Sequence, residues 1–132
     1  MGMEQGISGG DTRPVRLLIV DDSNIMRRRI ERSQQFAEIV VVGTASNGVQ
    51  ALDLARRTDP DLVTMDLTMP QMDGIECIGR LIEFKPAMRI LVISALTDKA
   101  TAVQAMEQGA NGFLHKPFTD RQLNDALAEL IS

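Results

Sequence analysis

The sequence predicts a single α/β domain built on an open, parallel, five-stranded sheet. Five short apolar runs, rich in Val, Ile and Leu and with little polar alternation, recur along the chain. Such runs are typical of strands that are buried on both faces. Helical patterns with start and stop signals separate the runs. With 132 residues the chain is long enough for one compact domain and far too short for an eightfold barrel.

The expected strands and helix starts can be given by residue. The strands are 15–20, 39–42, 62–65, 90–93 and 113–114. Residues that favour helix N-caps precede each helix: Ser23, Asn47, Asp73, Thr97 or Asp98, and Thr119. Thr119 stands three residues before Gln122, as in a capping box, and Gly109 follows the fourth helix where glycine is favoured.

Apolar positions indicate which helix faces are buried. In the first helix we expect Ile25, Met26 and Ile30 on one side, and in the second helix Val49 and Leu52. Five successive strand–helix units favour the flavodoxin-like, doubly wound fold with strand order 2-1-3-4-5. We assign residues 1–14, which contain four glycines, to a flexible leader and residues 15–132 to the domain.

Composition excludes several classes of function. The net charge of −4 argues against direct nucleic-acid binding, and the absence of Trp and Tyr argues against base stacking or a flavin site. The one cysteine, Cys77, rules out a disulfide framework and is expected to be a buried small side chain. No apolar run has the length of a membrane span and no apolar signal core is present, so we expect a cytoplasmic protein without membrane insertion.

Polar residues that can carry chemistry follow the predicted strands. Asp21 and Asp22 follow the strand at 15–20, and Asp66 follows 62–65. Ser94 follows 90–93, and Lys116 comes shortly after 113–114. In an open α/β sheet the binding crevice lies at the carboxyl ends of the strands, near the switch in strand order. The three carboxylates should therefore crowd together, which a divalent cation such as Mg²⁺ would relieve.

This set of residues points to phosphoryl chemistry on Asp66. Carboxylates form aspartyl phosphates in other proteins. A bound metal neutralises charge on the transferring group, while Lys116 and the Ser94 hydroxyl can bind phosphoryl oxygens. Each residue alone has an ordinary explanation as a turn former or solvated side chain. The combination at one sheet edge is what favours a site.

The chain from Val15 to Ile131 resembles the receiver domains of bacterial two-component response regulators. The matching stretches are Leu17–Ser23, Met65–Pro70, Met72–Gly74, Ser94-Ala95, Gly109-Ala110 and Lys116–Phe118. Together, in this order and at these spacings, they are very specific. The resemblance implies a single-domain, chemotaxis-type switch.

The resemblance also implies a role for each matching residue. Asp66 is the expected phosphoacceptor, and Mg²⁺ would be bound by Asp22, Asp66 and the backbone carbonyl of Thr68, with Asp21 helping directly or through water. Ser94 and Lys116 are expected to contact the phosphoryl group. Lys116 would precede a cis peptide bond to Pro117. Phe113 matches an aromatic switch position at which many relatives have Tyr, and a plain role as a core strand residue is equally open.

The resemblance implies a histidine kinase or histidine phosphotransfer protein as phosphodonor and a protein as downstream target. The output surface would be the fourth helix, the strand at 113–114 and the last helix. We expect a protein that catalyses only its own phosphorylation and dephosphorylation, not a turnover enzyme. A phosphatase of the haloacid-dehalogenase class is disfavoured because Thr68 stands where that class carries a second Asp. Two alternatives stay open: an interaction module that works without phosphorylation, and a receiver cut from a larger DNA-binding regulator.

Two other features have open interpretations. Arg27, Arg28, Arg29 and Arg32 form a basic cluster on the first helix. A solvated outer face is the plainer interpretation, and docking of the phosphodonor protein is the functional one. His115, the one histidine, is expected to have a packing or surface role.

Overall fold

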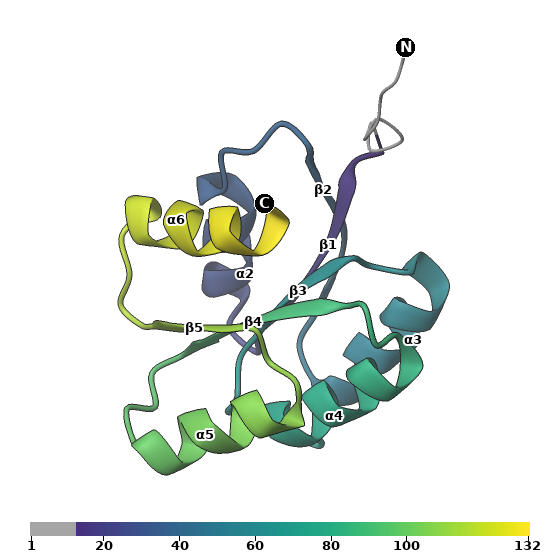
Figure 1. Ribbon diagram of the computed structural model, residues 1–132, viewed down its shortest axis with the longest axis vertical. Coiled ribbons are helices and arrows are strands. Elements are labelled where there is room, and N and C mark those ends of the chain that lie inside the picture. Colours follow the sequence, from purple (N-terminus) through teal and green to yellow (C-terminus); the bar gives the residue numbers. More distant parts are fainter. Residues whose placement is uncertain (1–12) are drawn as a thin grey trace.

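The computed structural model describes residues 13–132 and shows one parallel sheet with helices on both faces (Figure 1). The strands are β1 (Val15–Val20), β2 (Ile39–Ala45), β3 (Leu62–Met65), β4 (Arg89–Ser94) and β5 (Gly112–His115). The helices are α2 (Asn24–Ser33), α3 (Gly48–Thr58), α4 (Gly74–Phe84), α5 (Lys99–Gln108) and α6 (Asp120–Ile131). The strand order β2-β1-β3-β4-β5 confirms the predicted fold class and topology.

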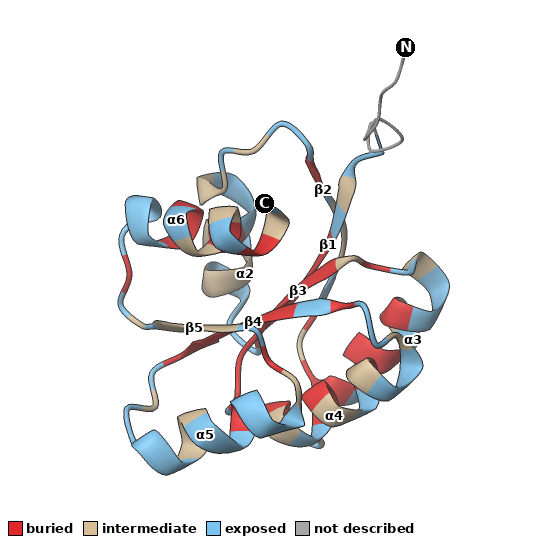
Figure 2. Ribbon diagram, in the orientation of Figure 1, coloured by how far each residue is buried: buried red, intermediate tan, exposed pale blue. Residues whose placement is uncertain are grey.

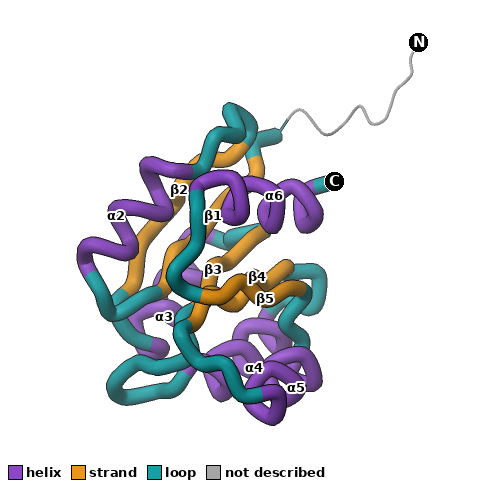
Figure 3. The backbone as a smooth tube through the Cα atoms, turned by 90° about the vertical axis from the view of Figure 1, so that its left-hand side faces the viewer, coloured by secondary structure: helices purple, strands orange, loops and turns teal. Residues whose placement is uncertain are grey.

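The sheet separates two apolar cores. Helices α2 and α6 cover one face, and α3, α4 and α5 cover the other, as Figures 1 and 3 show from two directions. Successive residues of a strand point into opposite cores. In β1, Leu17 and Ile19 pack toward α2 and α6, whereas Leu18 and Val20 pack toward α3 and α4. Figure 2 shows the central strands as almost continuously buried. This two-sided burial explains why the strand sequences lack polar alternation.

The predicted helix starts are confirmed. Each N-cap side chain accepts a hydrogen bond from the backbone amide three residues later, and Thr119 with Gln122 forms the full capping box. At the other end of α5, Gly109 has a φ of 120°, a backbone conformation that favours glycine. Two strands extend further than expected: β2 continues to Ala45, and β4 includes Ser94, which was expected to follow the strand. Residues 1–12 of the expected leader lie outside the described residues.

Two of the apolar positions were assigned to the wrong side of their helices. Ile25 is 81% exposed and Val49 is 53% exposed. Ile25 and Ile30 are five residues apart, which turns them about 140° away from each other on a helix. In α3 the buried stripe is Ala51, Leu52 and Ala55, and Val49 lies nearly opposite Ala51. In both helices the apolar residue of the first turn lies off the buried stripe.

A buried asparagine joins α6 to the end of α2. The Asn124 side-chain amide donates to the backbone carbonyls of Ser33 and Asp120, at 2.9 and 2.8 Å. Its carbonyl oxygen accepts a hydrogen bond from the Gln35 amide at 2.8 Å. Asn124 is thereby satisfied although only 8% exposed. Within residues 13–132 no helix is long and apolar enough to cross a bilayer.

One buried hydroxyl provides a test of the packing under the site. Within residues 13–132, Thr64 Oγ1 of β3 has no hydrogen-bond partner. We expect Thr64→Val to raise the free energy of unfolding by up to about 1 kcal/mol in urea titrations, because it removes an unsatisfied polar group at nearly constant volume. The matched variant Thr58→Val should gain nothing, since Thr58 Oγ1 donates to the Leu54 carbonyl at 2.7 Å. A Thr64→Val protein less stable than wild type by 1 kcal/mol or more would contradict this view.

Candidate functional site

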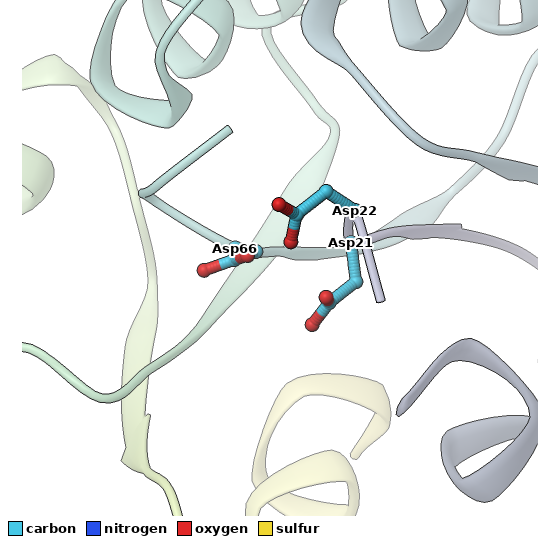
Figure 4. Close-up of side chains that lie close together, drawn as sticks. All are labelled: Asp21, Asp22 and Asp66. Carbon is cyan, nitrogen blue, oxygen red and sulfur yellow. The ribbon is translucent and has the colours of Figure 1, made fainter. Parts of the chain in front are cut away.

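Three carboxylates meet at the carboxyl ends of the two central strands. Asp21 and Asp22 follow β1, and Asp66 follows the neighbouring strand β3, whose Met65 pairs with Val20. Each of the three offers one carboxylate oxygen that lies within 4.8 Å of the others (Figure 4). Asp21 and Asp66 are only 1% and 2% exposed, whereas Asp22 is exposed to solvent. The predicted acidic pocket is therefore present, with one open side.

A lysine from the far edge of the sheet completes the pocket. Lys116 Nζ lies 2.8 Å from Asp21 Oδ2 and 3.8 Å from Asp66 Oδ1. Its backbone amide donates to the Ser94 carbonyl at 2.9 Å, which continues the pairing of β5 with β4 beyond His115. The Lys116–Pro117 peptide bond is cis, as the resemblance implied. One ammonium group thus faces two buried carboxylates and leaves the set with a net negative charge.

Burial and nearby charges shift the pKa of Asp66 upward. The pKa of Asp66 is raised from 3.8 to about 6, first by burial and second by the nearby Asp21 carboxylate. The Lys116 ammonium and the Thr68 amide act in the opposite direction, and Asp22 adds a smaller upward contribution to the pKa. The negative charge of the buried Asp66 is therefore only partly compensated by the protein. A cation would bind most favourably beside it.

The loop between β3 and α4 fixes the orientation of Asp66. The Thr68 amide and hydroxyl donate to Asp66 Oδ1 at 3.3 and 3.4 Å. Gly74, the first residue of α4, packs so closely behind Asp66 that a Cβ there would lie 2.4 Å from the Asp66 carbonyl oxygen. Only glycine fits at this position without moving the backbone. In the sequence Gly74 stands out only as part of a matching motif, and this steric requirement cannot be seen there.

Ser94 and Phe113 lie on the neighbouring strands β4 and β5, where Phe113 pairs with Val92, two residues before Ser94. Ser94 is fully buried, and its hydroxyl oxygen accepts a hydrogen bond from the Leu96 amide at 3.1 Å. Phe113 is half-buried against the core under α3, α4 and α5. Its ring lies 4.8 Å from the ring of the exposed His115. Both the core role and the switch role considered for Phe113 are compatible with this position.

The basic cluster of α2 contains two exposed arginines and two arginines that bind backbone carbonyls of nearby loops. Arg28 and Arg32 are exposed, as a solvated face requires. Arg27 instead donates to the backbone carbonyl of Asp21 at 2.7 Å. Arg29 donates to the Phe118 carbonyl, stacks 4.3 Å above the Phe118 ring and lies 3.5 Å from Asp120 Oδ1.

Arg27 and Arg29 belong to the basic cluster in the sequence, but the sequence does not predict their contacts with the loops. They hold the loops that carry Asp21 and Lys116, one on each side of the pocket. Four arginines within six consecutive positions must point in different directions around a helix. The sequence does not show which of them reaches a loop.

Cys77 is buried, as expected for a small side chain in the core. It lies on α4, and burial raises the pKa of its thiol to about 12. A thiol with such a pKa is protonated and unreactive at neutral pH.

The fold and the pocket define a CheY-like α/β domain with an acidic, lysine-containing site at the carboxyl edge of its sheet. Comparison with known proteins agrees with this class. The family described as the response regulator receiver domain matches residues 17–128. The chemotaxis protein CheY of Thermotoga maritima is 38% identical over 112 residues, covering 85% of this chain and 93% of CheY.

Two further similarities differ in how much of the other protein they cover. The nitrate/nitrite response regulator NarL of Escherichia coli K12 is 38% identical over 115 residues, which cover 86% of this chain and 53% of NarL. A solved CheX–CheY–BeF3–Mg complex from Borrelia burgdorferi matches with a TM-score of 0.87, at 29% identity and 96% coverage of both chains. The chain belongs to the response regulator receiver domain family, the phosphorylation-dependent signalling modules of two-component systems.

The donor set of this chain fits the Mg²⁺ that receiver domains bind. Mg²⁺ prefers oxygen ligands and retains several waters, so it needs few protein carboxylates and one open side. Asp21, Asp22 and Asp66 supply the oxygens, and the exposure of Asp22 supplies the open side. The pKa of Asp66 is raised first by burial and second by Asp21, so a cation bound beside Asp66 would stabilise its charged form.

The raised pKa of Asp66 predicts a pH dependence of stability in metal-free buffer. The folded protein holds the Asp66 proton more tightly than the unfolded chain, so this residue's contribution to stability falls as the pH rises from about 4 to about 6. Asp66→Asn should remove this loss and be more stable than wild type at pH 7.5, by about 1 kcal/mol after allowance for solvent screening. Urea titrations in EDTA at pH 4 and 7.5 measure the difference. Equal gains at both pH values would show that charge is not the cause.

The contacts of Arg29 predict a difference between neighbouring arginines. Arg29→Ala removes the bond to the Phe118 carbonyl and the stacking on its ring, and we expect a loss of about 1–2 kcal/mol in the free energy of unfolding. Arg28→Ala, one residue away and exposed, should change stability by less than about 0.5 kcal/mol. Similar losses for both variants would mean that Arg29 contributes only helix propensity.

Proposed function

We propose that this protein is a cytoplasmic switch that accepts a phosphoryl group on Asp66, with Mg²⁺, from a histidine kinase or histidine phosphotransfer protein. The observation that carries the proposal is the pairing of a buried, undercompensated Asp66 with Lys116 at the open edge of the sheet. The surface of α5, β5 and α6 then controls a downstream protein. These details go beyond family membership and are supported by the geometry of this chain's own residues.

The proposed transfer is a simple displacement at phosphorus. A carboxylate oxygen of Asp66 forms the new P–O bond, and the P–N bond to the donor histidine breaks, leaving its electron pair on the imidazole nitrogen. Asp21, Asp22, Asp66 and the Thr68 carbonyl would hold Mg²⁺, which supplies neutralisation of phosphoryl charge. Lys116 binds a phosphoryl oxygen as a point charge. Thr68 keeps the carboxylate oriented through its amide.

Two contacts described above would change when Asp66 carries the phosphoryl group. Lys116 now lies closer to Asp21 than to Asp66, at 2.8 against 3.8 Å, and would move toward the new anion. The Ser94 hydroxyl, now an acceptor for the Leu96 amide, would turn to donate to a phosphoryl oxygen. The loops after β4 and β5 would follow these side chains, which shifts the population of the output surface. Hydrolysis of the acyl phosphate by water returns the starting state.

This cycle makes the protein a switch that acts on itself and does not turn over an external substrate. Two other functions remain as alternatives to be tested. A module that works without phosphorylation would use the same surfaces, and the complete carboxylate–lysine set argues against it. A receiver within a longer DNA-binding regulator would use the same phosphoryl chemistry, and the match to about half of NarL makes it a real alternative.

Phosphotransfer from acetyl phosphate is the direct test. We expect a single phosphoryl adduct by intact-mass measurement in the presence of Mg²⁺, labile in alkali as an acyl phosphate is. Asp66→Asn and an EDTA control should show none. Lys116→Met should form the adduct at least about tenfold more slowly, because the charge that binds a phosphoryl oxygen is gone.

Two results would contradict the proposal. An adduct that persists in Asp66→Asn would place the phosphoryl group elsewhere. Absence of any adduct, from acetyl phosphate and from phosphohistidine donors alike, would favour the module that works without phosphorylation.

A further inference from the structure

A groove between α4 and α5 lies apart from the three carboxylates of the site and borders α5, the first element of the proposed output surface. The two helices run side by side on one face of the sheet (Figures 1 and 3), and the groove between them has a volume of about 850 Å³ and is open to solvent. Ile75, Gly79 and Ile82 line it along α4, at helical spacing. Leu67 and Leu96 close the end nearest Asp66. The α4 side of the groove is therefore largely apolar, whereas Thr101, Gln104 and Gln108 line its α5 side with polar groups.

The rim of the groove is acidic. Four carboxylates and one guanidinium line it: Asp73, Glu76, Glu83, Glu107 and Arg80. Arg80 is already paired with Glu76 at 2.9 Å, and Asp73 caps α4 by accepting from the Glu76 amide. Among residues 13–132, neither Glu83 nor Glu107 forms an ion pair. Two carboxylates without an ion-pair partner thus lie on the rim beside the apolar α4 side of the groove.

The depth of the groove depends on a glycine in the middle of a helix. Gly79 is an interior residue of α4, where glycine costs about 1 kcal/mol relative to alanine. A Cβ at this position would lie 2.5 Å from Oε1 of Gln108, the flexible end of a side chain on α5. A side chain at residue 79 would therefore project between the two helices and displace the end of the Gln108 side chain.

We propose that this groove binds a cationic, amphipathic peptide segment of a partner protein. Apolar side chains of the segment would cover Ile75 and Ile82, and its Lys or Arg residues would pair with Glu83 and Glu107. The acidic rim repels nucleic acid and anionic lipid, and the open shape suits a segment of chain better than a small molecule. Charge complementarity therefore selects a basic peptide as the occupant.

The groove is connected to the switch through its end residues. Leu67 follows Asp66 directly, and the Leu96 amide donates to the Ser94 hydroxyl. If Ser94 turns toward a phosphoryl group, Leu96 loses this bond and the end of the groove changes. This coupling rests on the proposed function, whereas binding of the peptide does not. By linkage, a peptide that prefers one state of the switch would also shift phosphorylation.

The test uses the unphosphorylated full chain and peptide fluorescence. The protein has no Trp or Tyr, so one Trp at the end of a synthetic peptide reports binding without background. The probes are three 14-residue amphipathic Leu/Arg peptides that differ in the spacing of their Arg residues, together with versions in which every Arg is replaced by Glu. We expect micromolar binding of at least one Arg peptide and none of the Glu peptides.

Matched variants locate the binding surface. Glu83→Gln with Glu107→Gln should weaken binding roughly two- to tenfold, and Gly79→Met at least about tenfold, with unchanged circular dichroism. The control pair Glu31→Gln with Glu129→Gln changes two exposed carboxylates on α2 and α6, on the other face of the sheet, and should leave affinity unchanged. Equal weakening by the two double variants would show that the peptide is attracted only by the net charge of the protein. That result would overturn the proposal that the groove is the binding site. Failure of all three Arg peptides to bind would also overturn it.

Two further measurements separate the remaining explanations. If sedimentation shows that the protein alone forms a dimer, and Gly79→Met abolishes the dimer, a second copy of the chain is the occupant. That result would overturn the peptide proposal.

Beryllofluoride with Mg²⁺ as a phosphoryl mimic should change peptide affinity roughly fivefold or more, and no change would overturn the coupling alone. The groove variants should still accept phosphate from acetyl phosphate. Peptide binding without any phosphoryl adduct would refute the proposed function and leave the groove standing.

Discussion

The structure is organised around like charges brought together at the ends of two adjacent strands. Pairing of β1 with β3 places Asp21 beside Asp66 in a nearly water-free position, and this arrangement works against folding unless positive charge is near. Lys116 supplies part of that charge from the opposite side of the pocket. The fold tolerates the remaining imbalance because the apolar cores above and below the sheet are extensive. The imbalance is what leaves the site ready for a cation and a phosphoryl group.

The supports of this pocket come from parts of the chain far apart in sequence. Arg27 holds the loop of Asp21, Arg29 holds the segment after Lys116, and Gly74 allows α4 to start directly behind Asp66. None of these residues touches the carboxylate oxygens. They fix the loops on which the charged groups stand, which is how a few side chains are kept in a repulsive arrangement.

The sequence predicted the fold and the identity of the pocket residues well, because both follow from short-range signals. Apolar runs of strand length, cap residues and strand-end carboxylates are visible one segment at a time. The prediction was wrong about the side of the helix on which two single residues lie. Ile25 and Val49 are apolar residues in first turns, where helix rotation relative to the sheet decides exposure and periodicity over one turn is too short to define it. The contacts of Arg29 and the groove beside Gly79 depend on long-range packing, so no local pattern could predict them.

The junction between α2 and α6 has a consequence for synthesis of the protein. Leu17 and Ile19 of the first strand are covered on one face by Leu123 and Leu127 of the last helix, and Asn124 completes the end of α2. The opposite core needs only α3, α4 and α5, which leave the ribosome earlier. During translation the nascent chain can therefore build one half of its core while the other half stays exposed. Until α6 emerges, this apolar strand face is exposed to other chains, and transiently exposed apolar surface of this kind favours aggregation.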